Sequence, residues 1–438
     1  MEYINKNETD KKTAETYFHQ LNLIEPITRA LEELNYTNPT PIQEQAIPEI
    51  LKGRDVLGCA QTGTGKTAAF TVPLLNNLIM KKTQVGPKQA AILILSPTRE
   101  LAVQIHESVL QYGKYLNLKT ALVYGGVGQG PQVKALSKGV DVLVATPGRL
   151  LDLISQKYVF LNKVSAFVLD EADRMLDMGF ITDIKKIIPL LPHQRHTLFF
   201  SATMPTDIVN LSQKLLKEPV RIEVTPAATT AEKISQWLMY VDAAKKRDLL
   251  RHLLNDKTLK RVIVFTRTKH GANRVSELLQ KNQISSEAIH GNKSQNARQR
   301  ALDNFKAGHT RVLIATDIAA RGIDVDGITH VINYEIPNIA ESYVHRIGRT
   351  ARAGAEGIAI SFCDSEEKAY IRDIEKITGM AIPVNKDHPY HSHAVEQSAT
   401  MSKGKAKAKI EGSQGKKKDY SFRGNKSSYQ RFQGRKKD

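Results

Sequence analysis

A phosphate-binding loop constrains this chain more than any other feature. The apolar run 55–59 leads into Ala60-Gln61-Thr62-Gly63-Thr64-Gly65-Lys66-Thr67, and sequence typical of a helix follows. A strand, glycine-bearing loop and helix in this order turn backbone N–H groups toward phosphates, while the lysine adds a positive charge. The pattern therefore predicts a parallel α/β fold with a nucleoside triphosphate site at Lys66 and Thr67.

The second half of such a site follows about a hundred residues later. A short apolar run ends in Asp170-Glu171-Ala172-Asp173. In P-loop enzymes, carboxylates at the end of such a strand hold Mg²⁺ and orient the attacking water. An isolated Asp-Glu pair is usually a solvated turn, but the loop upstream favours the catalytic interpretation.

Further motifs follow one another in a characteristic order. They are Tyr36-Thr37-Asn38-Pro39-Thr40-Pro41-Ile42-Gln43, Pro97-Thr98-Arg99-Glu100-Leu101, Gly125-Gly126, Thr146-Pro147-Gly148-Arg149, Ser201-Ala202-Thr203, Gln295-Asn296-Ala297-Arg298, Ala315-Thr316-Asp317 and His345-Arg346-Ile347-Gly348-Arg349-Thr350-Ala351-Arg352. With the loop and the D-E-A-D tetrad, this set resembles the DEAD-box family of ATP-dependent RNA helicases. Within this family the chain resembles the bacterial, RhlE-like branch most, because its N-terminal segment is short and no folded C-terminal module is evident in the sequence.

The resemblance implies an RNA-stimulated ATPase that uses ATP and Mg²⁺ to separate RNA duplexes locally or to remodel RNA–protein complexes. Thr67 and Asp170 would hold Mg²⁺, partly through water. Catalysis would depend on Glu171, Lys66 and two arginine fingers, Arg349 and Arg352. The nucleotide would be bound by Phe18, Tyr36, Gln43, Gln61, Thr62, Gly63, Thr64, Gly65, Lys66, Thr67, Asp170 and Asp324.

The same resemblance implies RNA contacts in both halves of the chain. Such contacts reach sugar and phosphate, so we expect binding without sequence preference. The implied RNA-binding residues are Pro97, Thr98, Arg99, Gly126, Thr146, Arg149, Thr266, Arg298 and Thr316. The residues implied to couple ATP state to strand separation are Ser201, Thr203, Asp173 and His345.

Short apolar runs alternate with helical stretches in two consecutive series, which indicates two tandem α/β domains with parallel sheets. By resemblance both are RecA-like. The segment 36–43 resembles the family's Q motif. We expect an N-terminal segment with this motif at 1–45, an ATP-binding domain at 46–220, a linker at 221–235, a second helicase domain at 236–380 and a basic, disordered tail at 381–438.

Charge and composition set the tail apart. The chain carries a net charge of +18, and residues 401–438 hold ten Lys and three Arg against three acidic residues. Aromatic residues lie among these cations at 420, 422, 429 and 432. Rings that stack on bases beside cations that meet phosphates are typical of RNA-binding tails, although a solubilising extension is an alternative.

Other features exclude several classes of protein. Only two cysteines occur, so a disulfide framework is excluded, and the start has no apolar run typical of a signal peptide. We expect a cytoplasmic monomer without a membrane segment. His388, His391 and His393 have no matching carboxylate or cysteine spacing, so we interpret them as part of a solvated linker and expect no metal beyond Mg²⁺.

Three positions depart from the family pattern. Ala60, Asn35 and Ala351 stand where glycine is usual. Because asparagine and alanine restrict the backbone, we expect φ at Asn35 and Ala351 to lie in ordinary or asparagine-tolerated regions.

Two alternatives stay open. An RNA clamp would use ATP only to lock itself on RNA and assemble partners, and a DNA helicase of the same superfamily would share the ATP site. The RNA, the pathway (ribosome assembly, RNA turnover or cold adaptation) and any ribosome-assembly or RNA-decay protein partner do not follow from these residues.

Overall fold

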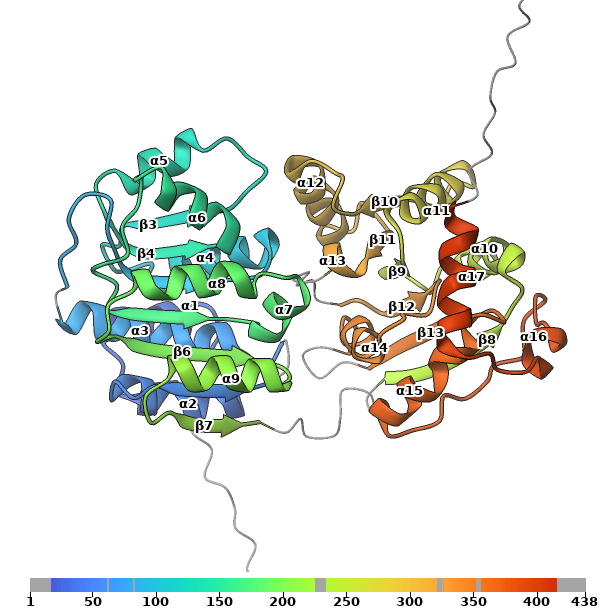
Figure 1. The fold of residues 1–438 in the computed structure, drawn as a ribbon, viewed down its shortest axis with the longest axis horizontal. Helices are drawn as coiled ribbons and strands as arrows, with labels where there is room; N and C mark the ends of the chain where they lie inside the picture. Colours follow the sequence, from blue (N-terminus) through green and yellow to red (C-terminus); the bar gives the residue numbers. More distant parts are fainter. Residues whose placement is uncertain are drawn as a thin grey trace, which may run out of the picture.

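The computed structural model describes residues 17–60, 63–81, 83–224, 234–320, 325, 327–351 and 356–415. These residues form two lobes that lie side by side, each a parallel sheet with helices on both faces (Figure 1). Most of the expected linker, residues 225–233, lies outside the described residues. None of the described helices is long and apolar enough to cross a membrane.

The first lobe contains a 7-stranded sheet in the order β3-β4-β2-β5-β6-β1-β7. All its strand pairs are parallel, as the buried runs of Val, Ile and Leu predict. The strands are β1 (Val56–Cys59), β2 (Ala90–Leu95), β3 (Thr120–Val123), β4 (Val140–Ala145), β5 (Ala166–Leu169), β6 (His196–Ser201) and β7 (Val220–Glu223).

Successive residues of each strand point to opposite faces, so the first sheet has two apolar cores. On β5, Val168 joins the core beneath α1–α4, whereas Phe167 and Leu169 join the core beneath α5–α9. The helices are α1 (Glu25–Glu33), α2 (Pro41–Leu51), α3 (Lys66–Lys81), α4 (Arg99–Tyr112), α5 (Gly130–Leu136), α6 (Pro147–Ser155), α7 (Ala172–Asp177), α8 (Ile181–Ile187) and α9 (Thr206–Leu215), with 3₁₀ turns at Phe18–Leu21 and Ile188–Leu190.

The second lobe contains a 6-stranded sheet in the order β10-β11-β9-β12-β13-β8, again with parallel pairs. Its strands are β8 (Ile234–Tyr240), β9 (Val262–Thr266), β10 (Ser286–Ile289), β11 (Val312–Thr316), β12 (His330–Asn333) and β13 (Gly357–Cys363). Its helices are α10 (Lys246–Asn255), α11 (Lys269–Lys281), α12 (Gln295–Lys306), α13 (Asp317–Ala320), α14 (Ala340–Ile347), α15 (Lys368–Thr378), α16 (His393–Gln397) and α17 (Lys403–Gly415), with a 3₁₀ turn at Ala243–Lys245. The predicted pair of parallel-sheet α/β domains is confirmed.

Residues 381–415 differ from the expectation of a disordered tail. Val384 pairs with Leu238 of β8, and α17 packs near α15 with Ala406 fully buried. The Lys368 ammonium donates hydrogen bonds to the carbonyls that end α16, at Val395, Glu396 and Ser398, over 3.1, 2.8 and 2.6 Å. The polar composition of this segment did not reveal its few buried apolar residues or the hydrogen bonds from Lys368. The expected start of the disordered tail at 381 is therefore corrected for residues 381–415, and residues 416–438 lie outside the described residues.

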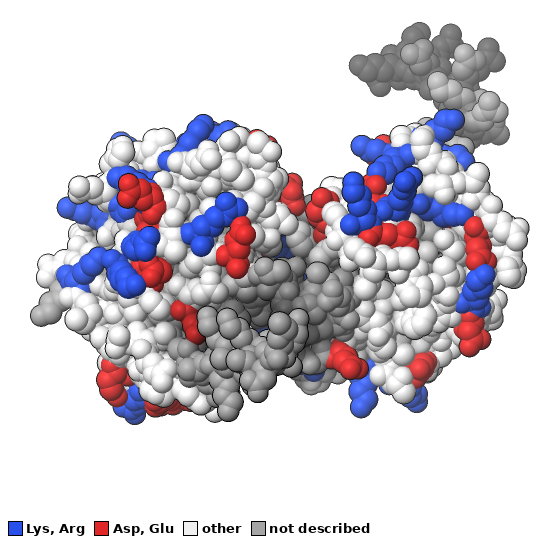
Figure 2. Space-filling model, turned by 90° about the horizontal axis from the view of Figure 1, so that it is seen from below, with Lys and Arg blue, Asp and Glu red and all other residues white. Residues whose placement is uncertain are grey.

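Lys and Arg side chains on the described surface are mixed with acidic ones. Figure 2 shows basic residues on both lobes with Asp and Glu among them. Since residues 401–438 hold more than half of the net charge of +18, the basic excess belongs mainly to the C-terminal end of the sequence.

Two of the positions that replace a family glycine have left-handed backbone. Asn35 lies at φ 58°, a conformation that asparagine tolerates, as expected. Ala351 lies at φ 55°, which also falls in the expected asparagine-tolerated region but is a conformation that alanine rarely adopts. The turn after α14 therefore holds Ala351 in the left-handed conformation that glycine adopts most easily, although alanine carries a Cβ.

We expect Ala351→Gly to raise the free energy of unfolding of the second domain by about 1 kcal/mol, because glycine removes the left-handed penalty of a Cβ. Urea denaturation followed by circular dichroism measures this change. Ala301→Gly, inside α12, is the matched control and should destabilise the protein, since it adds flexibility to a helix and removes a buried methyl group. Equal destabilisation by both variants would contradict the account.

Candidate nucleotide and nucleic-acid site

The phosphate-binding loop joins β1 to α3, as the sequence predicts. Gly63 and Gly65 lie at φ 86° and 92°, where a side chain is strained, and α3 begins at Lys66. Lys66 is buried, and its ammonium donates a 2.7 Å hydrogen bond to the carbonyl of Ala60, which closes the loop. Thr67 follows on the first turn of α3, while Gln61 and Thr62 lie outside the described residues.

The start of α2 clamps this loop from the other side. The Thr40 hydroxyl donates to the carbonyl of Thr64 over 2.8 Å, and the Gln43 amide donates to the carbonyl of Gly65 over 3.1 Å. The Gln43 carbonyl oxygen also accepts from the Thr40 N–H at 2.8 Å, which caps α2. A side-chain amide has two hydrogens and two lone pairs, so Gln43 retains one donor and one acceptor for an adenine edge.

An aromatic group lies beside this clamp. Tyr36 stands edge-on to Phe18, with ring centroids 5.7 Å apart, and to Tyr112 at 5.9 Å. The hydroxyls of Tyr36 and Tyr112 share a 3.1 Å hydrogen bond. Tyr112 comes from the end of α4 and was missed by the sequence analysis, because no motif marks it.

The D-E-A-D residues follow β5 and are buried. Asp170 and Glu171 are 2% and 3% exposed, and Glu171 precedes α7 with left-handed φ and ψ of 54° and 53°. Arg174, one turn along α7, forms a buried ion pair with Glu171. Glu171 therefore has its own cation, whereas Asp170 Oδ1 is buried without a hydrogen-bond partner among the described residues.

The pKa values of the two carboxyl groups are shifted in opposite directions. Burial raises the pKa of Asp170 to about 7, although Lys66 opposes this change. Burial would also raise the pKa of Glu171, but Arg174 and Lys66 outweigh it and hold that pKa at about 2. Asp170 has a carboxylate oxygen without a hydrogen-bond partner among the described residues, and Lys66 of the loop is close enough to lower its pKa. Carboxylate oxygen is a donor that Mg²⁺ prefers, so Asp170 fits the expected ion.

Asp173 links the tetrad to the segment after β6. Its carboxylate accepts hydrogen bonds from the N–H and the hydroxyl of Thr203, both at 2.8 Å. The Ser201 hydroxyl accepts from the Asp173 N–H at 3.2 Å and donates to the Thr203 carbonyl at 2.7 Å. The structure thus joins three of the four predicted coupling residues by hydrogen bonds. The fourth, His345 on α14 of the second lobe, lines one cavity with Asp173 and Thr203.

Arg349 brings a cation from the second lobe to this site. It is 4% exposed, its Nε donates to the carbonyl of His345 over 3.2 Å, and it shares a small cavity with Arg174. It lies close enough to Glu171 to help lower the pKa of that carboxyl. The other predicted finger, Arg352, and the predicted ribose contact, Asp324, lie outside the described residues.

Arg346 holds the second lobe's part of the site together. Its guanidinium pairs with both carboxylate oxygens of Asp317, at 2.5 and 2.8 Å, and donates to the carbonyl of Glu335 over 2.6 Å. It also stacks 5.0 Å from the ring of Phe265. The sequence analysis quoted Arg346 and Asp317 within motifs but assigned them no role, because only the fold shows that they meet.

The predicted RNA-binding residues of the first lobe gather around one loop. The Arg99 guanidinium lies against Gly126, where a Cβ would come within 2.1 Å of Nη1. Arg149 donates to the carbonyl of Val127 over 3.1 Å. Thr98 is the N-cap of α4, and Thr146 is the N-cap of α6. Pro97 and Thr146 follow β2 and β4, so these groups share the carboxyl edge of the sheet.

The two lobes touch through a polar cluster on this side. Glu100 Oε1 pairs with Arg298 Nη2 at 3.0 Å and accepts from the Gln295 amide at 3.0 Å. Arg99 also donates to Gln295 over 3.4 Å. Thr266 and Thr316 end β9 and β11, whose carboxyl edge faces the same side. Glu100 was quoted in a motif without a role, and its partner across the lobes becomes visible only in the fold.

Two family profiles cover most of the chain. The profile described as "DEAD/DEAH box helicase" matches residues 40–211, and that described as "Helicase conserved C-terminal domain" matches residues 245–354. The chain is 41% identical over 396 residues to "DEAD-box ATP-dependent RNA helicase CshA" of Bacillus thuringiensis (strain Al Hakam), which covers 90% of this chain and 74% of that protein. It is 44% identical over 370 residues to "ATP-dependent RNA helicase DeaD" of Escherichia coli (strain K12), with 84% and 58% covered.

Solved structures show the same fold. S. cerevisiae Dbp5 bound to RNA and ADP BeF3 superposes with a TM-score of 0.74 at 32% identity, covering 84% of this chain and 95% of that one. Mss116p bound to ssRNA and AMP-PNP superposes with a TM-score of 0.78 at 27% identity, covering 92% and 86%.

We expect Gly65→Ala to weaken nucleotide binding at least about tenfold, because a Cβ there would lie 2.4 Å from the Gln43 amide nitrogen and break the clamp on the loop. Fluorescence titration with a labelled ATP analogue measures the affinity. Gly53→Ala is the matched control, since Gly53 also has a positive φ, of 80°, but nothing within 4 Å of the added Cβ. If Gly65→Ala binds as well as Gly53→Ala, the clamp is not needed for binding.

Proposed function

Since the chain belongs to the DEAD-box family of ATP-dependent RNA helicases, we propose that RNA switches on its ATPase by drawing both lobes around one nucleotide. The observation that carries the proposal is the position of Arg349, a buried cation of the second lobe that acts on Glu171 of the first. Phosphoryl transfer leaves little covalent work to a protein, so the rate depends on such placed charges.

Each lobe supplies part of the chemistry. Lys66 and the amides of the loop hold the β- and γ-phosphates, Glu171 orients the attacking water, and Arg349 with Arg352 neutralises charge that develops on the transferred group. Thr67 and Asp170 would hold Mg²⁺, which would neutralise phosphate charge. The remaining nucleotide contacts are those implied by the resemblance: Phe18, Tyr36, Gln43, Gln61, Thr62, Gly63, Thr64, Gly65 and Asp324.

RNA lies across both lobes on the predicted sugar and phosphate contacts. Arg298 then exchanges its ion pair with Glu100 for a phosphate, or shares the two. A ligand that touches both lobes favours the closed arrangement by its differential affinity for it, and ATP and RNA do so together. Release after hydrolysis follows because the γ-phosphate no longer joins the lobes.

Several finer statements belong to this proposal. We place the first domain from residue 46 to the end of β7 and the second from the start of β8 to the end of α17. We assign the chain a role as a cytoplasmic monomer that acts on RNA without sequence preference. Partners in ribosome assembly or RNA decay are family-level expectations. An RNA clamp with slow release is the second candidate function, because Glu171 is held in a buried ion pair with Arg174.

We predict that Glu171→Gln keeps ATP and RNA binding but lowers kcat by orders of magnitude, because the amide preserves shape and cannot orient water as a carboxylate does. Single-turnover hydrolysis with separate binding titrations measures both properties. Glu107→Gln, the same change at an exposed residue of α4, is the matched control and should turn over normally. Turnover near the wild-type rate in Glu171→Gln would remove the assigned role.

The test of the proposed function is the steady-state ATPase rate with Mg²⁺, with and without RNA, using single-stranded DNA of equal length as the control. We predict strong stimulation by RNA and little by DNA, since sugar contacts distinguish the two. Equal stimulation by DNA would favour the DNA-helicase alternative, and RNA binding without stimulation would favour the clamp.

We also predict that removal of residues 416–438 weakens RNA binding and flattens its salt dependence. This segment holds nine Lys and Arg against two Asp. Each phosphate contact that is lost lowers the slope of log affinity against log salt by about 0.7 for single strands. Fluorescence anisotropy at several salt concentrations measures the slope, and the ATPase rate at saturating RNA is the control that should not change. An unchanged slope would make the segment a spacer.

A further inference from the structure

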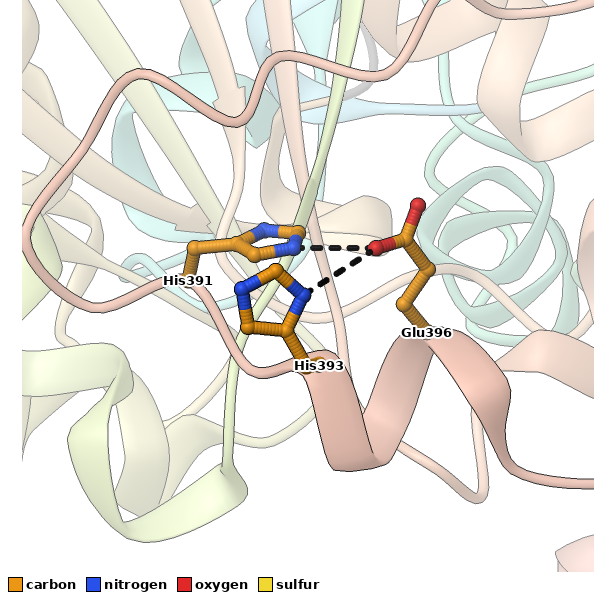
Figure 3. A group of neighbouring side chains, drawn as sticks. All are labelled: His391, His393 and Glu396. Carbon is orange, nitrogen blue, oxygen red and sulfur yellow. Dashed lines mark hydrogen bonds and ion pairs between the residues drawn. The ribbon is translucent and has the colours of Figure 1, made fainter.

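A histidine cluster on the second lobe forms a site that the ATPase does not use. His391, His393 and Glu396 offer three ligand atoms that all lie within 4.8 Å of one another. Both imidazoles point toward one carboxylate oxygen (Figure 3). This overturns the interpretation of these histidines as a solvated linker, because Glu396 is the carboxylate that the sequence spacing did not reveal.

The separations suit a metal ion. His391 Nε2 lies 3.0 Å from Glu396 Oε2, and His393 Nδ1 lies 3.8 Å from the same oxygen. Tetrahedral ligands with bonds of about 2.0–2.1 Å lie about 3.3 Å apart, so an ion requires only small side-chain shifts. Two imidazoles and one carboxylate are the donors that Zn²⁺ accepts, and they leave a fourth position for water.

The surrounding chain fixes these ligands. Ser392 is the N-cap of α16, so His393 and Glu396 share one face of its first turn. The Ser392 N–H also donates to the carbonyl of Tyr240 at the end of β8, and the Lys368 ammonium caps the far end of α16. The ligands therefore sit on a short helix that is fastened at both ends.

Neighbouring groups orient the ligands. Lys386 pairs with Glu396 Oε1 at 2.6 Å, which leaves Oε2 for the imidazoles. The ring of His388 stands edge-on to His391 with centroids 5.7 Å apart. His388 is 9% exposed, and neither of its ring nitrogens has a hydrogen-bond partner within the described part of the chain. A buried imidazole whose nitrogens lack hydrogen-bond partners is costly unless a polar group or ion joins it, and this one lies beside the potential ligand His391.

We propose that His391, His393 and Glu396 bind a divalent transition-metal ion, with Zn²⁺ the best fit. The ion would fasten residue 391 to α16 and so hold the segment 386–396, which follows α15, against the end of β8. The side chain of His393 is 75% exposed, so the ion would enter from solvent. Its role is structural, since the site lies on a lobe surface formed by residues 386–396, apart from the nucleotide residues.

The test is Co²⁺ and Zn²⁺ binding to the full chain without a histidine tag, in excess Mg²⁺ to fill hard-oxygen sites. Co²⁺ absorption should show a low-coordinate site, one ion per chain, without sulfur-to-metal charge transfer. Zn²⁺ should displace it in competition with a chromophoric chelator. This readout is independent of ATPase activity.

Variants locate the ion. We expect His393→Ala and Glu396→Gln each to weaken Zn²⁺ binding by at least about 10- to 100-fold, the loss seen even for groups that only support a ligand. His393 is exposed, so its removal should leave folding intact. His309→Ala, which removes an exposed imidazole elsewhere on the lobe, should bind Zn²⁺ like the parent protein. Absence of binding, or equal binding by all three variants, would overturn the proposal.

Discussion

The cations of the second lobe must lie near the carboxylates of the first for the two halves of this chain to act as one enzyme. A buried carboxylate pair in one lobe is costly without positive charge nearby. Lys66 and Arg174 supply that charge from within the first lobe, and Arg349 adds to it from the second. The distance between the lobes therefore determines the distance between Arg349 and the carboxylates of the active site. A ligand that changes the first distance also changes the second.

The same constraint explains the polar cluster around Glu100. Glu100 receives Arg298 and Gln295 from the second lobe on the side where the predicted RNA contacts gather. The ion pair between Glu100 and Arg298 is buried, so breaking it is costly unless another charged group replaces the lost partner. An RNA phosphate is such a replacement partner for Arg298, so an interface with this ion pair suits a chain that exchanges lobe contacts for RNA contacts.

Much of this architecture could be predicted from residues alone. The apolar runs that form β1, β2, β4–β6, β9 and β11–β13 are short, rich in Val, Ile and Leu, and spaced by helical sequence, so parallel sheets follow from this pattern. The runs of β3 and β10 are too short and too polar to be recognised in this way. What could not be predicted depends on distant residues that meet only in the fold. Tyr112 beside Tyr36, Arg346 with Asp317 and Glu100 with Arg298 are pairs of this kind. The prediction from composition was wrong for residues 381–415, because a few buried apolar side chains, such as Val395 and Ala406, are enough to pack this segment on the second lobe.

The central claim is that ATP and RNA favour the same closed arrangement, and thermodynamic linkage tests it most directly. The affinity for a non-hydrolysable ATP analogue is measured with and without saturating RNA, and the affinity for RNA with and without the analogue. The account predicts that each ligand strengthens the other by the same factor, and that Arg349→Ala reduces this factor more than it reduces either affinity alone. Independent binding of the two ligands in the parent protein would contradict it.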